Sequence, residues 1–145
     1  MQAFNPPDPG FESRVRSSFN LQQLMKTINA KLVRVSPGEA HIEIPFQEAL
    51  TQQNGFIHAG IITSIVDSAC GYATYSLMTA ASGVLTVEFK INLLAPAIGE
   101  RFLAIGRVKK PGRTLTVCEG DVFAHNQGED KLVATMLATM MRLST

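Results

Sequence analysis

The chain has 145 residues, of which 46% are hydrophobic and 17% are charged, and its formal net charge is +1. This composition is that of one folded domain and excludes a disordered chain. The balanced charge gives no basic footprint, so we expect no nucleic-acid partner. Cys70 and Cys118 lie far apart in the sequence, which suits reduced thiols and a cytoplasmic protein.

The first third of the chain predicts an arm, a helix and a β-hairpin. Residues 1–10 are rich in proline, and we expect them to form a loose N-terminal arm. From Phe11 to Asn29 the apolar residues fall near helical spacing, which predicts one amphipathic helix. The stretch "KLVRVSPGEAHIEIPF" alternates apolar and polar residues around a Ser-Pro-Gly-Glu turn, which is typical of two paired strands.

The rest of the chain predicts one buried helix and four strands. After a loop over residues 46–58, residues 59–78 are almost wholly apolar, but Asp67 and several hydroxyl groups argue against a membrane span. The stretch "GVLTVEFKINLLAPA" predicts a strand, and breaks at residues 110–112 and 126–130 divide the remainder into three more. We expect residues 1–145 to form a single α+β domain, with an antiparallel sheet curled around the apolar helix.

The carboxylate within this apolar helix, Asp67, is the clearest functional signal. Gly60, Ser64, Gly71 and Thr74 recur with it every three or four residues and form a stripe of small or polar side chains. Close approach of another element explains the small residues. It does not explain the acid, because a buried carboxylate is costly unless it is paired or hydrogen-bonded. The residues alone leave a structural and a catalytic acid equally open.

The loop "GFIHAG" presents backbone N–H groups at the start of the same helix. These amides have no acceptor within the helix, and the helix dipole favours negative charge there, so they suit a carbonyl oxygen that becomes an oxyanion. His58 and Asp67 are separated by roughly 13 Å along a helix, too far to act on one substrate atom. A second copy of the chain could bring its own Asp67 to this loop. We therefore expect a homodimer with active sites at the interface.

The segment "NGFIHAG", with Asp67 nine residues after His58, resembles the hot-dog-fold thioesterases of the phenylacetic-acid-degradation (PaaI-like) type. The resemblance implies the hot-dog fold, an antiparallel sheet wrapped around one long central helix. It also implies hydrolysis of an acyl-CoA to a free acid and CoA, with coenzyme A as part of the substrate and no cofactor. We expect two homodimers to form a homotetramer. No spacing of Cys, His and carboxylates predicts a metal site.

The resemblance also implies roles for individual residues. Asp67 corresponds to the general base or nucleophile, and the backbone N–H of Ala59 to the donor that polarises the thioester carbonyl. Gly60 corresponds to the glycine at the helix start. His58 corresponds to the motif histidine, for which a hydrogen bond that orders the loop and a direct catalytic role are equally open.

Polar residues near the helix complete the implied site. Gln52 stands where the family often has an asparagine near the leaving sulfur or the attacking water, and Gln53 and Asn54 could substitute for it. Thr86 corresponds to a serine or threonine that positions the water or the acid. The candidate contacts for the CoA phosphates are basic, although an ordinary solvated charge is the more common role for any one of them: Lys90, Lys109, Lys110 and Arg113. The candidate lining of an aromatic or medium-chain acyl pocket is large and apolar: Phe56, Tyr72, Tyr75 and Met78.

Two other functions remain open. A hot-dog hydratase or dehydratase would have a histidine shortly after the acid, and the sequence "SACGYAT" after Asp67 has none. A non-catalytic acyl-CoA-binding hot-dog protein would keep the pocket without turnover, and hydrolysis of a panel of acyl-CoAs would distinguish it from an enzyme.

Overall fold

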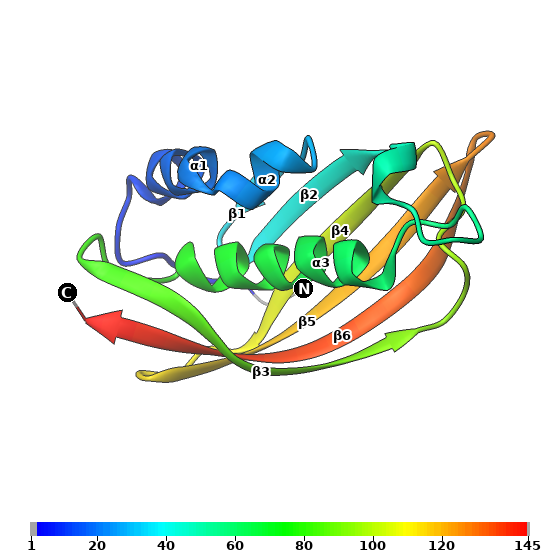
Figure 1. Ribbon diagram of the computed structural model, residues 1–145. Helices are drawn as coiled ribbons and strands as arrows, with labels where there is room; N and C mark the ends of the chain where they lie inside the picture. The colour runs from blue at the N-terminus through cyan, green and yellow to red at the C-terminus, as the bar shows by residue number, and fades with distance from the viewer. Residues whose placement is uncertain (1–2, 145) are drawn as a thin grey trace.

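The computed structural model describes residues 3–144, in which one antiparallel sheet curls around a long helix (Figure 1). The helices are α1 (Phe11–Leu21), α2 (Gln23–Thr27), the short 3-10 helix η1 (Glu48–Leu50) and α3 (Ala59–Tyr75). The strands are β1 (Lys31–Ser36), β2 (Glu39–Pro45), β3 (Ser82–Leu93), β4 (Arg101–Lys110), β5 (Leu115–Asn126) and β6 (Glu129–Ser144). They lie in the order β1-β2-β4-β5-β6-β3. The predicted α+β hot-dog architecture is confirmed.

Helix α3 rests directly on the middle of the sheet because two glycines leave room for it. Gly106 of β4 and Gly120 of β5 face each other in the strand register. A Cβ atom at Gly106 would lie 2.3 Å from the carbonyl carbon of Ala69, and one at Gly120 would lie 2.5 Å from Cγ2 of Val66. Larger residues would push the helix away from the sheet, so this contact fixes the height of α3 and of every side chain it carries.

The N-terminal helix predicted from Phe11 to Asn29 is wrong in one respect, because the chain forms two helices there. Gln22 interrupts the helix with an extended backbone, φ −76° and ψ 107°. This bend allows Phe19 of α1 and Met25 of α2 both to reach the core, whereas Leu21 beside the bend stays 76% exposed. Burial of both ends outweighs the helical hydrogen bonds lost at the bend, a tertiary effect that periodicity alone does not reveal.

The segment that we expected to be a loose arm is held at two points within its described part, residues 3–10. Phe4 packs against the core, and Asp8 accepts a hydrogen bond of 2.8 Å from Nε of Arg14. The guanidinium of Arg14 also donates to the carbonyl of Tyr75, the last residue of α3. Helix α3 ends there, three residues earlier than predicted.

Strand β3 lies at the edge of the sheet and pairs with β6. Its register shifts between Thr86 and Glu88, the signature of a β-bulge at Val87. Thr86 is opposite Met140, and after the bulge Phe89 is opposite Ala138, so both Thr86 and Phe89 face the helix side of the sheet. Within residues 3–144 no helix combines the length and the apolar character needed to cross a membrane.

Candidate active site

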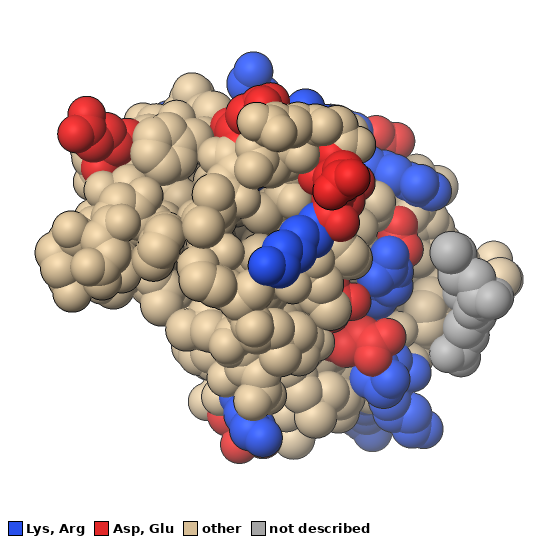
Figure 2. All heavy atoms as spheres, turned by 90° about the vertical axis from the view of Figure 1, so that its right-hand side faces the viewer, with Lys and Arg blue, Asp and Glu red and all other residues tan. Residues whose placement is uncertain are grey.

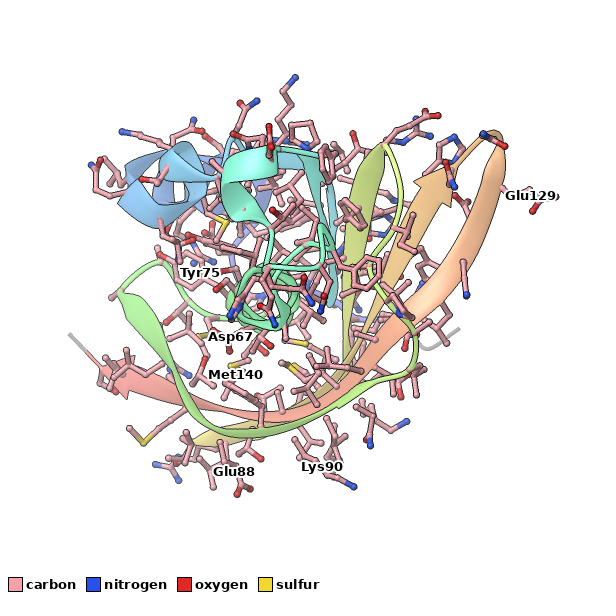
Figure 3. All side chains as sticks on the ribbon, turned by 45° about the vertical axis from the view of Figure 1, so that its right-hand side comes forward. Asp67, Tyr75, Glu88, Lys90, Glu129 and Met140 are labelled. Atoms are coloured by element: carbon pink, nitrogen blue, oxygen red, sulfur yellow. The ribbon has the colours of Figure 1, made fainter. Side chains whose placement is uncertain are left out.

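Asp67 points from α3 toward the sheet, above Met140 (Figure 3). Its oxygen Oδ1 accepts a hydrogen bond of 2.7 Å from Oγ1 of Thr86. Burial raises the pKa of Asp67 above its ordinary value of 3.8, and the Thr86 hydrogen bond only partly opposes this shift. Among the described residues Oδ2 has no hydrogen-bond partner. The carboxylate is therefore held on one side and free on the other, where it can accept a proton.

Asp67 opens into a pocket of about 440 Å³ between α3, the start of β3 and the N-terminal helices. Two of the expected acyl-pocket residues, Tyr72 and Tyr75, line it, together with Thr86. The complete lining is Ser18, Leu21, Gln22, Asp67, Ser68, Gly71, Tyr72, Tyr75, Gly83, Val84, Thr86 and Met140.

The start of α3 leaves one backbone amide free. His58 is the N-cap residue, and its ring nitrogen Nδ1 accepts a hydrogen bond of 2.8 Å from the N–H of Gly60. The N–H of His58 itself donates to the carbonyl of Leu50. Among residues 3–144 the N–H of Ala59 has no such acceptor. The ring of His58 thus orders the helix start, which is one of the two roles considered for it, and Ala59 presents the amide available to a ligand.

The loop before α3 is a tight turn, and its residue Gln52 lines one pocket together with Ala59. The side-chain carbonyl of Gln52 accepts a hydrogen bond from the N–H of Asn54, and its backbone bonds to Phe56 and Gly55 close the turn. Gly55 has φ +83°, which favours glycine. A second pocket of about 380 Å³ lies here, lined by Gln52, Phe56, Ile57, Ala59, Ile62, Leu93, Leu94, Ala95, Pro96, Ala97 and Val133.

The predicted site residues that line a pocket are divided between two separate pockets of one protomer, and His58 and Gly60 line neither. Asp67 and Thr86 line the first, whereas Gln52, Phe56 and Ala59 line the second. Ala59 and Asp67 are roughly 12 Å apart along α3, so one chain alone cannot bring them to one substrate atom. Gln53 and Asn54 are exposed and line neither pocket, and neither does Met78, which is buried.

The four basic candidates lie outside both pockets. Lys90 projects from the face of β3 opposite Asp67 (Figure 3), and Nζ of Lys109 bonds to the carboxylate of Glu119 at 2.6 Å. Lys110 and Arg113 are exposed at the turn between β4 and β5. Three further polar residues, Ser18, Gln22 and Ser68, line the Asp67 pocket. They carried no sequence signal, because only the bend between α1 and α2 brings Ser18 and Gln22 to the face of α3 that carries Ser68. Within residues 3–144 no three His, Cys, Asp or Glu side chains gather as a metal site.

The sequence model of the thioesterase superfamily matches residues 54–131, more than half of the chain. The chain belongs to the thioesterase superfamily. This thioesterase is thus a thioester hydrolase by class, and its matched segment contains Ala59, Asp67 and Thr86.

Known proteins agree with this assignment. A thioesterase family protein from Silicibacter pomeroyi has a crystal structure that superposes on this thioesterase with a TM-score of 0.93 and 49% identity, covering 94% of this chain and 100% of the other. Acyl-coenzyme A thioesterase 13 of Homo sapiens is 31% identical over 104 residues, 71% of this chain and 72% of that protein. The PaaI protein of the phenylacetic acid degradation operon of E. coli shares the fold at 18% identity, with a TM-score of 0.83 and coverage of 92% and 94%. The PaaI-like resemblance seen in the sequence is confirmed.

Proposed function

We propose that this thioesterase hydrolyses an acyl-CoA to a free acid and CoA, with Asp67 as the general base and the N–H of Ala59 as the oxyanion donor. One observation carries the proposal. A carboxylate fixed by Thr86 at 2.7 Å opens into a pocket, and a helix start with a free amide opens into another. The similarity to acyl-coenzyme A thioesterase 13 supports acyl-CoA as the substrate class.

The two pockets require a second protomer to form one site. Strand β3 offers an edge for it, because Leu85, Val87 and Leu93 are each more than half exposed and an apolar edge strand invites pairing. Figure 2 views the molecule from the end that carries the loop before α3, and most of the left half of that view is uncharged. A two-fold dimer would pair the two β3 strands antiparallel to each other.

Antiparallel pairing of two β3 strands would bring the Asp67 pocket of one protomer to the Ala59 pocket of its partner. The start of β3, at Gly83 to Thr86, belongs to the Asp67 pocket, and its end, at Leu93, belongs to the Ala59 pocket. In an antiparallel pair the start of one strand lies beside the end of the other. Asp67 of each protomer would then face the Ala59 amide of its partner, and the dimer would hold two equivalent sites. The association of two dimers into a homotetramer stays a prediction.

The reaction follows from these two groups. Asp67 takes a proton from water while the water oxygen bonds to the thioester carbon, and the carbonyl oxygen becomes an oxyanion on the Ala59 N–H. The oxyanion then reforms the carbonyl, the carbon–sulfur bond breaks, and the thiolate of CoA takes the proton from Asp67. Gln52 lines the same pocket as Ala59, and we assign its side-chain amide to a hydrogen bond with the sulfur or the water. Two buried free cysteines suit the cytoplasmic location that we propose.

Hydrolysis of a panel of acyl-CoAs, followed with a thiol reagent that detects released CoA, tests this function. We expect turnover of at least one acyl-CoA, and we expect crotonyl-CoA to yield CoA and free acid without hydration of its double bond. A protein that binds acyl-CoAs in calorimetry and releases no thiol from any of them would instead be a non-catalytic binding module.

A further inference from the structure

Gly71 is the feature of the Asp67 pocket that the reaction leaves unexplained. It lies inside α3, four residues after Asp67, and therefore on the same face of the helix. Glycine inside a helix lowers stability relative to alanine. Gly106 and Gly120 avoid collisions between the sheet and α3, but at Gly71 a Cβ atom would meet no heavy atom beyond its own helix within 4 Å, among residues 3–144. Packing within one protomer therefore does not require glycine at this position.

The open space at Gly71 belongs to the pocket. Asp67, Gly71 and Tyr75 follow one another at intervals of four residues and all line it, so the pocket runs along α3 for roughly 12 Å. Tyr75 is the last residue of the helix. The guanidinium of Arg14 lies 4.2 Å from the centre of its ring, and the ring of Tyr72 packs edge-on against it at 6.4 Å. The far end of the pocket is thus a fixed aromatic wall.

The bend between α1 and α2 forms another wall and is fastened to α3 beside the acid. Oγ of Ser68, the residue after Asp67, donates a hydrogen bond of 3.3 Å to Oε1 of Gln22 at the bend. One turn further along, the hydroxyl groups of Ser18 and Tyr72 lie 3.5 Å apart. These contacts hold the wall in place, and the absence of a side chain at Gly71 leaves open space in front of it.

We propose that Gly71 is the specificity-determining residue of this thioesterase and that the acyl group is a medium-length chain. The chain lies along α3 from Asp67 toward Tyr75 and occupies the space that a Cβ at Gly71 would fill. This inference rests on the proposed function, because it places the thioester carbon at Asp67.

Matched kinetics of the wild type, Gly71→Ala and Gly71→Leu test the inference, with octanoyl-CoA and acetyl-CoA as probes. The ratio of kcat/KM for octanoyl-CoA to kcat/KM for acetyl-CoA should fall about tenfold in Gly71→Ala and further in Gly71→Leu, since one methylene in a pocket changes discrimination by this order. The melting temperature of Gly71→Ala should rise by about 4 °C, because alanine favours the helix. Ser64→Ala is the control, since Ser64 lies on the same side of α3 and lines neither pocket. It should leave the ratio unchanged.

Three outcomes would overturn the inference, and they have different meanings. An unchanged ratio in both Gly71 variants would show that the acyl chain lies elsewhere. Equal losses on both substrates together with a changed oligomeric state would show that Gly71 serves contact between protomers. A wild type that hydrolyses no acyl-CoA would remove the proposed function and this inference with it. Should the Gly71 variants fail to fold, Val84→Leu narrows the same pocket from β3, because Val84 lines it and lies on the helix side of the sheet with Thr86, and the same fall in the ratio is required.

Discussion

The substitution Ala59→Pro would remove the proposed oxyanion donor and little else. Ala59 is the first residue of α3, a position where proline is well tolerated because its missing N–H would have no helical acceptor. His58 before it has φ −58° and ψ 137°, which lies in the range that a following proline demands. We therefore expect the free energy of unfolding to change by less than about 1 kcal/mol.

The effect on catalysis should be much larger. Loss of one oxyanion donor lowers kcat by about 10²- to 10³-fold, equivalent to about 2.7–4 kcal/mol in the barrier. The assay is steady-state release of CoA from the best acyl-CoA of the panel, with circular dichroism to compare thermal unfolding. Ala59→Gly is the matched control, since it keeps the amide and should retain most of the activity. A folded Ala59→Pro protein that turns over at the wild-type rate would refute the assignment of the oxyanion donor.

The remaining predictions concern Asp67 and its partners. Thr86→Val removes the hydroxyl that lowers the pKa of Asp67, so the acid limb of the kcat/KM profile should move to higher pH. The value of kcat/KM near neutral pH should fall by about threefold to tenfold. A pH profile that does not move would show that the Thr86 hydrogen bond does not tune Asp67. Since the pKa of Asp67 is raised on folding, its protonated form favours the native state, and this contribution is fully present below the ordinary value of 3.8 and is lost as the pH rises through the folded value. Denaturant titrations should therefore show that Asp67→Asn gains stability relative to the wild type as the pH increases through that window, and a difference independent of pH would count against burial of the charge. Coexpression of Asp67→Asn with Ala59→Pro chains should restore about one quarter of wild-type activity, because each mixed dimer has one intact site, and no restoration would place both groups of a site in one protomer.

The sequence predicted the fold well where the burial of apolar side chains dominates. The apolar run of α3 could be stable only inside a sheet, and the alternation in the later strands specified that sheet. The prediction of a single N-terminal helix was wrong because the bend at Gln22 depends on the residues against which α1 and α2 pack. The periodicity of the sequence carries no information about those contacts. Strand β3 gives a second case. Strict alternation of Phe89 with its neighbours puts Thr86 on the opposite face, and only the bulge at Val87 turns Thr86 toward Asp67.

The candidate site likewise contains residues that the sequence reveals and residues that only the folded chain brings together. A charged residue in an apolar helix is unusual in itself, so Asp67 could be recognised from the sequence, and the amides that follow His58 are a property of any helix start. The wall of the acyl pocket could not be recognised, because Gln22 and Ser68 are 46 residues apart in the chain and meet only in the folded protein. The charge of a basic residue does not reveal which face of a sheet it occupies, and Lys90 lies on the face away from the acid.

The most direct test of the account is the turnover of Asp67→Asn. Asparagine keeps the size of the side chain and can still bond to Thr86, but it cannot accept a proton from water. With the fold and the oligomeric state unchanged, hydrolysis of the best acyl-CoA should fall by about 10²-fold or more. Equal turnover by Asp67→Asn and the wild type would remove Asp67 from the reaction.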